Sequence, residues 1–281
     1  FYQDLLQLPV SDRALERLLQ VDVPTNLQED NVIRSGFNDS GISKNNRLLE
    51  RHDSAFGTYW RSYDFAGNTD KQNIFSHPLG PNGRNGFVMD GGEIIFSLPN
   101  GLQGYMLVDA KGNRIDKGPT SIVSDSKRPD RTVVNGLSCM SCHNQGIIEK
   151  DDQIRKHVLA NHQSFSKDEA DAVVSIYPTS KKLNEVYRED IERFCKAVEK
   201  TGGKVDASLK IVGTDPVVAL ATLFEQEVDI HLAAAELGLS FKDFSKRLDE
   251  SPKLARDLGL LKNEGGTVKR DTFVASFRTI V

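Results

Sequence analysis

The chain has 281 residues, 38% of them hydrophobic and 27% charged, and its formal net charge is −4 at pH 7. These values are typical of a globular protein rather than a membrane or disordered one, and no run approaches the 18 apolar residues of a membrane span. The mildly acidic balance argues against nucleic-acid binding, which needs a clustered basic surface, and the length suits one large domain or two modest ones.

The first half of the chain predicts one helical region and a small sheet. Leucines at helical spacing over residues 4–20 predict a helix that Pro9 interrupts. Residues 22–50 are polar and turn-rich, and residues 51–86 place many aromatic side chains among glycines and asparagines, so we expect irregular, well-anchored loops there. Apolar runs within residues 87–124, separated by Asn-Gly and Lys-Gly-Asn turns, predict an antiparallel β-meander with a last short strand near Ile122 and Val123.

The second half of the chain is helical in pattern. Residues 166–169 form a capping box, in which serine and glutamate three residues apart start a helix. Residues 180–200 repeat apolar side chains at the spacing of an amphipathic helix. The Asp-Pro pair at residues 215–216 indicates another helix start, and the apolar stripe over residues 217–232 predicts the helix that follows it.

The most informative segment is Cys-Met-Ser-Cys-His at residues 139–143. Two cysteines separated by two residues and followed at once by histidine are the attachment signature of c-type haem. The thiols of Cys139 and Cys142 would add to the two vinyl groups at one edge of the porphyrin, and His143 would supply the proximal nitrogen ligand to the iron. The sequence therefore predicts one covalently bound haem.

Two other interpretations of the cysteine pair remain open. A structural zinc site needs four ligands, usually as a second close pair, whereas Cys195 is the one other cysteine and has no partner near it in the sequence. A redox dithiol usually follows a strand within a βαβ unit, whereas residues 125–130 read as a polar loop. The adjacent histidine favours haem over both.

The motif and its flanks carry a resemblance. Residues 134–138, which lead into the motif, and residues 144–147, which follow it, resemble the haem-binding segment of bacterial c-type cytochromes. Residues 73–81 and 91–103 are similar to parts of cytochrome-c-like modules in uncharacterised extracytoplasmic proteins of planctomycetes and myxobacteria. A small cytochrome c has a helix just before its haem motif, and the loop expected here departs from that pattern.

The resemblance implies one covalent haem c, with Cys139 and Cys142 as thioether donors and His143 as the proximal ligand. It also implies a location in the periplasm or at the cell surface and a redox partner protein. The chain opens at Phe1 without a signal peptide, so we expect that its targeting segment is missing. The oligomeric state is not predicted.

The group on the other side of the iron decides the function. A strong sixth ligand favours electron transfer, whereas an open position favours gas sensing or peroxidase-like chemistry. His77 is the first candidate, because the following proline biases it to an extended backbone, and His157 on a predicted helix is the second. Met89 and Met106 are less favoured ligands, and Met140 lies inside the motif and cannot reach the opposite face. Further candidates for the haem pocket are Trp60, Arg61 and Arg84.

Together these patterns predict an α+β protein that is mostly α-helical, with a small antiparallel β-meander in its N-terminal half. Residues 1–130 would form a loop-rich α/β region and residues 131–281 a helical region that carries the haem motif, unless the two make one integrated domain. We expect a monohaem c-type cytochrome that transfers single electrons rather than an enzyme. A haem-based gas or redox sensor and a peroxidase-like enzyme with an open distal site are the alternatives.

Overall fold

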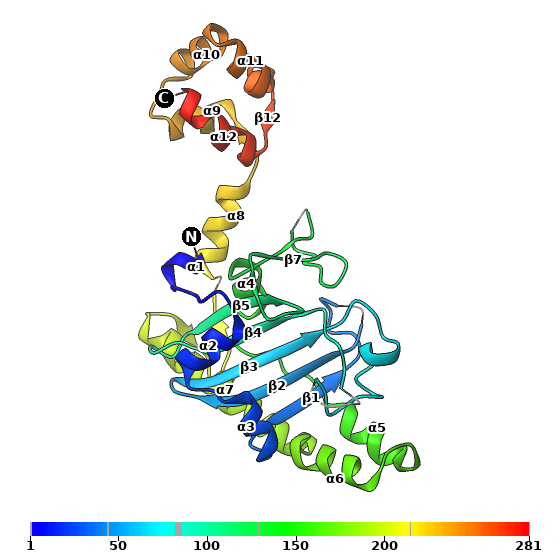
Figure 1. The fold of residues 1–281 in the computed structure, drawn as a ribbon. Coiled ribbons are helices and arrows are strands. Elements are labelled where there is room, and N and C mark those ends of the chain that lie inside the picture. The colour runs from blue at the N-terminus through cyan, green and yellow to red at the C-terminus, as the bar shows by residue number, and fades with distance from the viewer. Residues whose placement is uncertain (1, 44, 82–85, 129, 214, 281) are drawn as a thin grey trace. The chain divides into compact units, whose positions relative to one another are not determined.

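The computed structural model describes residues 2–43, 45–81, 86–128, 130–213 and 215–280 (Figure 1). The chain divides into two compact units, Phe1–Gly213 and Thr214–Val281. Residue 130, where the sequence suggested a boundary, lies within the first unit. Each unit is described by itself.

A six-stranded antiparallel sheet forms the centre of the first unit, and its strands pair strictly in chain order (Figure 1). The strands are β1 (Ile33–Phe37), β2 (Arg47–Ser54), β3 (Gly57–Asp64), β4 (Gly91–Ser97), β5 (Gln103–Asp109) and β6 (Arg114–Ile115). Two short pairs accompany the sheet: β7 (Lys117–Gly118) with β8 (Val133–Val134), and β9 (Lys204–Val205) with β10 (Ile211–Val212).

The prediction of a mostly helical protein with a small meander is wrong. Helices account for 43% of the chain and strands for 19%, so the fold is mixed α+β with a substantial sheet. The expected meander is present as β4 and β5, but residues 22–86, expected to be irregular, contain β1, β2 and β3. Residues Ile122 and Val123 form no strand.

Charged side chains inside the first three strands explain the error. Arg34, Glu50 and Arg61 are buried, and each is followed on its strand by another polar residue. The alternation of apolar and polar side chains that marks a strand with one wet face is therefore absent. Arg34 pairs with Glu50 on the neighbouring strand, and Arg61 pairs with Asp12 and Glu16 of an N-terminal helix. The sequence alone does not reveal these pairs.

The two faces of the sheet carry different helices. Tyr59 of β3 faces α2 (Asp12–Leu19) and α3 (Val23–Gln28), where Leu15 and Val23 join its hydrophobic cluster. The next residue, Trp60, points to the opposite face, because successive side chains of a strand alternate. On that face Trp60 packs in one cluster with Cys139 and Tyr187, which belong to α4 (Leu137–Cys142) and α7 (Ser180–Lys200).

The remaining elements of the first unit complete its cover. They are α1 (Tyr2–Leu5), η1 (Asp70–Gln72), α5 (Ile154–Ala160), η2 (His162–Ser164) and α6 (Lys167–Ile176). The predicted capping box at the start of α6 is confirmed: the Glu169 amide donates to the Ser166 hydroxyl at 3.2 Å, and the Ser166 amide donates to the Glu169 carboxylate at 2.9 Å. The helix predicted over residues 180–200 is confirmed as α7.

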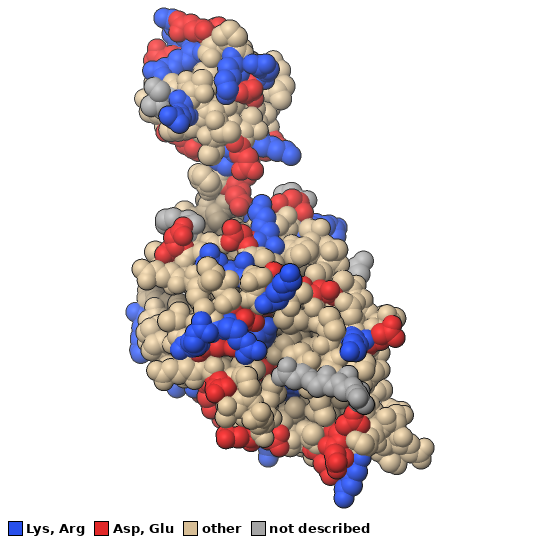
Figure 2. Space-filling view, viewed as in Figure 1, with Lys and Arg blue, Asp and Glu red and all other residues tan. Residues whose placement is uncertain are grey.

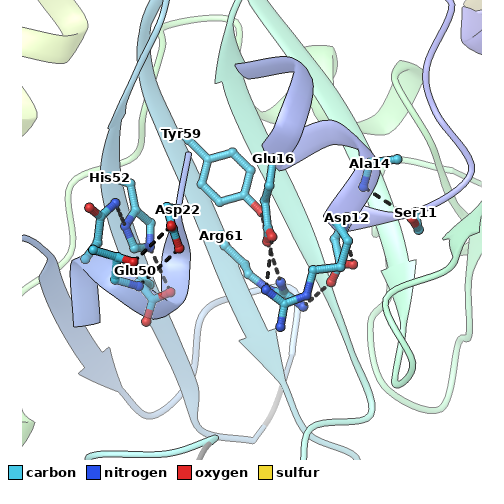
Figure 3. A network of polar contacts seen from close by, with 12 residues as sticks. Ser11, Asp12, Ala14, Glu16, Asp22, Glu50, His52, Tyr59 and Arg61 are labelled. Carbon is cyan, nitrogen blue, oxygen red and sulfur yellow. Dashed lines mark hydrogen bonds and ion pairs between the residues drawn. The ribbon is translucent and has the colours of Figure 1, made fainter. Parts of the chain in front are cut away.

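A buried polar network lies on the sheet face that carries α2 (Figure 3). Arg61 of β3 pairs with Asp12 at 2.8 Å and with Glu16 at 3.4 Å, both carboxylates reaching it from α2. On β2, Glu50 accepts hydrogen bonds from Arg34 at 2.8 Å and Tyr63 at 3.0 Å, and it contacts His52 at 2.9 Å. The charges of these buried residues are thus compensated by partner side chains.

The second unit is a small helical body with its own core. Its elements are α8 (Pro216–Glu225), β11 (Val228–Asp229), α9 (Ile230–Glu236), α10 (Phe241–Glu250), α11 (Pro252–Leu258), η3 (Gly259–Lys262), β12 (Thr267–Val268) and α12 (Arg270–Ile280). Val228, Phe244 and Phe273 are among the buried residues of its hydrophobic cluster. Asp215 caps α8 as expected, accepting from the Val218 amide at 2.9 Å. The stripe over residues 217–232 is not one helix, because α8 ends at Glu225 and the chain then enters β11.

Charges are mixed on the surface in view. Lys and Arg side chains lie among Asp and Glu side chains on the face shown in Figure 2, in keeping with the net charge of −4. Over the described residues, every helix is too short or too polar to cross a lipid bilayer.

Candidate functional site

The haem motif occupies α4, and the polar loop before it holds this helix in place. The Ser138 hydroxyl accepts from the Val134 amide at 3.1 Å and donates to the Asp125 carboxylate at 2.7 Å. The Lys127 ammonium donates to the Ser141 carbonyl at 2.9 Å. Asp125 and Lys127 therefore hold the motif in place through these hydrogen bonds.

Gly136, which precedes α4, should be intolerant of a side chain. Its φ is +79°, in the left-handed region, and a Cβ there would lie 2.6 Å from the ring of Tyr2. Gly41 has a similar φ of +86° but nothing within 4 Å, so Gly41→Ala measures the backbone cost alone, about 1–2 kcal/mol. We expect Gly136→Ala to lower the free energy of unfolding by a further 1–3 kcal/mol or so, because it also overpacks the site. Urea unfolding followed by circular dichroism measures both, and equal losses in the two variants would contradict the expectation.

The imidazole of His143 is held by one of its two nitrogens. Nδ1 lies 3.2 Å from the carbonyl oxygen of Gly146, which only accepts hydrogen bonds, so Nδ1 is the protonated nitrogen and donates. Gly146 has a φ of +95°, and this turn brings its carbonyl back to the ring. A metal-binding histidine is commonly oriented in this way, with its other nitrogen left for the metal. That nitrogen is Nε2, and His143 is only 9% exposed.

Nε2 of His143 faces a carboxylate from the sheet. Oε2 of Glu93, on β4, lies 3.7 Å from it. Burial alone would raise the pKa of Glu93, but its contacts with His143 and Arg47 lower that pKa to about 2, so the group is ionised at neutral pH. Arg47 is itself fixed by Asp64, whose Oδ1 accepts from the arginine Nε at 2.5 Å. A positive and a negative side chain thus stand beside the imidazole.

Two cavities meet at this contact. The first has a volume of about 40 Å³, and the thiol-bearing residues Cys139 and Cys142 line it. The second has a volume of about 70 Å³, and Trp60 and Lys150 line it. Both cavities are partly open to solvent, and both are smaller than the range of about 300–1,000 Å³ that is usual for small-molecule sites. The residues common to both cavities are Ile42, Arg47, Glu93 and His143.

The donor groups present match those of a covalently attached haem, although the space between them is smaller than a porphyrin. The two cysteines are free and line the same cavity as His143, whose Nε2 has no hydrogen-bond partner closer than the 3.7 Å contact with Glu93. The walls of this cavity are largely apolar, as a porphyrin requires; they include Leu107, Ile115, Ile122, Val123 and Val133.

The other interpretations of the cysteine pair fit less well. Burial raises the pKa of the Cys139 thiol well above its usual range and raises that of Cys142, whereas a redox dithiol needs a lowered thiol pKa. Cys195 lies on α7, donates to the Leu209 carbonyl at 3.4 Å and lines neither cavity. In the part of the chain that the structure describes, no group of three or more His, Cys, Asp or Glu side chains is arranged to hold a metal ion unaided.

The structure does not bring the predicted sixth ligands to His143. Neither His77 nor His157 lines either cavity. His157 packs edge-on against the rings of Phe75 and Phe165, at 5.3 and 6.0 Å between centroids. The Nδ1 atom of His77 is buried without a hydrogen-bond partner.

The methionines are also elsewhere. Met106 is fully buried in the hydrophobic cluster on the sheet face that carries α2. The sulfur of Met89 accepts from Arg61 at 3.8 Å, and Met140 packs at the edge of the α7 cluster. No methionine, and no histidine besides His143, lines the two cavities within the described chain.

The site contains residues that the sequence analysis missed. Glu93 and Arg47 border both cavities, and each is a charged residue within a strand of largely buried residues. A charged residue within an otherwise buried strand is the feature of the sequence that could have identified both residues as part of a site. Of the other pocket candidates, Trp60 lines the second cavity and its indole nitrogen donates to Asp190 at 2.8 Å.

The two arginine candidates have different outcomes. Arg61 borders the second cavity, but its guanidinium is committed to Asp12 and Glu16 on the opposite face of the sheet. Arg84 lies outside the described residues.

Comparisons with known proteins add no identification. A scan against protein-family models finds no match, and searches of curated proteins and of solved structures find none either.

Proposed function

We propose that this protein binds one haem c covalently and transfers single electrons outside the cytoplasm. The observation that carries the proposal is the placement of the Cys139 and Cys142 thiols and of His143 Nε2 around one largely apolar cavity. This set matches the chemistry that attachment needs: two thiols for the porphyrin edge and one free imidazole nitrogen for the iron.

The chain's own residues have separate parts in this proposal. When bound, the haem supplies a one-electron couple at its iron. Gly146 orients His143 through the Nδ1 hydrogen bond, and the thiols of Cys139 and Cys142 would fix the haem by covalent bonds that do not dissociate. Arg47 and Lys150, which line the second cavity, supply positive charge for the haem propionates.

The location and partner rest on the resemblance to c-type cytochromes. Attachment through this motif takes place outside the bacterial cytoplasm, so the proposed location is the periplasm or the cell surface. The mildly acidic chain suits a redox partner with a basic docking surface.

Covalent attachment is the first test. The chain, exported together with the cytochrome c maturation system, should retain haem after denaturation and acid–acetone extraction. The pyridine haemochrome spectrum should report two thioether bonds. Loss of all haem to the acetone phase would overturn the proposal.

Electron transfer is tested separately from attachment. A potentiometric titration should convert the ferric spectrum to the ferrous one reversibly, with one electron per chain. Rapid consumption of hydrogen peroxide by the ferric protein would instead favour the peroxidase-like alternative.

A further inference from the structure

The chain between β7 and β8 forms one wall of the cavity that the motif thiols line. Residues 119–128, which we call the lid, follow β7 directly and contain neither helix nor strand. The lid contributes four residues to this cavity: Pro119, Ile122, Val123 and Asp125. Other walls belong to β4, β5 and β6 of the sheet and to α4, which carries the thiols.

The lid in this position leaves little room at the thiols. The cavity measures about 40 Å³, whereas sites for small molecules usually measure about 300–1,000 Å³. The thiol-bearing residue Cys139 is only 2% exposed. A porphyrin therefore reaches this thiol only if a wall of the cavity moves.

The lid is the wall with the least to hold it. β4 pairs with β5 over seven consecutive residue pairs, and it pairs with β3 on its other side, so moving a sheet wall would break a ladder of backbone hydrogen bonds. The lid has turns in place of a ladder. Segments with few backbone hydrogen bonds to their surroundings open at the lowest cost in free energy.

The side chains of Asp125 and Lys127 hold the lid to α4. The carboxylate of Asp125, which is 5% exposed, accepts from the Ser138 hydroxyl at 2.7 Å. The ammonium of Lys127 donates to the Ser141 carbonyl at 2.9 Å. Both bonds involve a charged group, and such hydrogen bonds are stronger than those between neutral groups. We call this pair of bonds the latch.

Other bonds of the lid show which contacts an opening would break. The Ser124 amide donates to the Ile42 carbonyl, outside the lid, at 3.2 Å, so this bond breaks when the lid leaves its place. The Val123 amide donates to the Pro119 carbonyl at 3.0 Å, and both groups belong to the lid. This turn can stay intact while the lid moves as a unit.

We propose that residues 119–128 are a lid that covers the thiols of Cys139 and Cys142, is latched to α4 by Asp125 and Lys127, and opens to admit the porphyrin. The purpose of the lid rests on the proposed haem attachment. Its closure over the thiols does not, and it is tested on the full chain produced without the cytochrome c maturation system.

The first experiment measures how often the lid opens. Iodoacetamide is added to the folded, haem-free chain, and peptide mass spectrometry follows the labelling of Cys139 and of Cys195. Cys195 is also 2% exposed but lies on α7, so it serves as a reference within the same molecule. Asp125→Ala breaks the latch and should speed the labelling of Cys139 about tenfold, equivalent to about 1.4 kcal/mol, while Cys195 keeps its rate.

Asp130→Ala is the matched control. It removes a carboxylate close to the lid, but the Asp130 side chain is 54% exposed and accepts from the Thr132 amide at 3.1 Å. It should leave the labelling of Cys139 unchanged. Equal rates in the wild type, Asp125→Ala and Asp130→Ala would overturn the lid. If Asp125→Ala does not fold, Lys127→Ala, which changes an exposed side chain, breaks the other half of the latch and decides the same question.

The second experiment compares the haem-free and haem-loaded proteins by hydrogen exchange. Because the ring needs the space that the lid occupies, the Ser124 amide should exchange faster in the loaded protein. Equal protection in both forms would overturn the opening of the lid for haem. If the wild type carries no covalent haem, the proposed function fails, and the labelling of Cys139 still decides whether the lid covers the thiols.

Discussion

Replacing Cys139 and Cys142 together by alanine should abolish covalent haem incorporation. Both residues line the same cavity beside His143, and without a thiol no thioether bond to the porphyrin can form. Each single variant should keep at most one thioether. The measurement is haem that stays with the polypeptide after denaturing electrophoresis.

Cys195→Ala provides the matched control for this loss. Cys195 is also buried, but it lies on α7, donates to a backbone carbonyl and lines neither cavity. It should keep the full haem content of the wild type. Covalent haem in the double variant, or its loss in Cys195→Ala, would show that the attachment site has been assigned to the wrong thiols.

Replacing Glu50 by glutamine should destabilise the first unit by about 3–5 kcal/mol, because it leaves the guanidinium of Arg34 buried and charged without its partner. Neither side chain of this ion pair is exposed, and Glu50 also accepts a hydrogen bond from Tyr63. A loss of that size is a large part of the roughly 5–15 kcal/mol that stabilises a typical domain.

Asp53→Asn is the control for Glu50→Gln. Asp53 lies on the same strand and pairs with Arg51 at 2.9 Å, but its side chain is 88% exposed. Removing an exposed partner should cost about 1 kcal/mol or less. Urea unfolding at pH 7 compares the two variants, and similar losses would mean that the Glu50 network is not as dry as the structure indicates.

Acid should weaken the same network. Burial would raise the pKa of Glu50, but Arg34 and His52 outweigh it and lower the pKa to about 2. Since a carboxyl group in the unfolded chain titrates near about pH 4.3, this contribution is complete above that pH and is lost as the pH falls toward about 2. The difference in unfolding free energy between wild type and Glu50→Gln should therefore shrink between about pH 5 and pH 2. A constant difference across that range would contradict the assignment.

The parts of the fold with local causes were predictable from the sequence. The capping box at Ser166, the N-cap at Asp215 and the amphipathic pattern of α7 all act within a few residues, and the structure contains each of them. The meander at β4 and β5 followed from turn chemistry that is also local.

The other parts depend on pairs of residues distant in the chain. β1, β2 and β3 carry buried charges. These charges are compensated by pairs between distant residues, Arg34 with Glu50 and Arg61 with Asp12, so the strands could not be predicted from local sequence patterns. The same holds for the candidate site. The motif is contiguous and was identified at once, whereas Glu93 is 50 residues from His143 along the sequence and meets it only through the sheet.

The chain-order pairing of the sheet also bears on how the site assembles. In the six-stranded sheet, each strand pairs with the next strand along the chain. Each pairing therefore closes a short loop, except that between β3 and β4, which are separated by residues 65–90. Such local pairings form fast, because little chain entropy is lost in closing each loop. During synthesis β1 to β6 emerge before the attachment segment, and α7 emerges after it. The sheet that lines the cavity can therefore form before the thiols reach it, while α7, which packs on the same face, is synthesised after them.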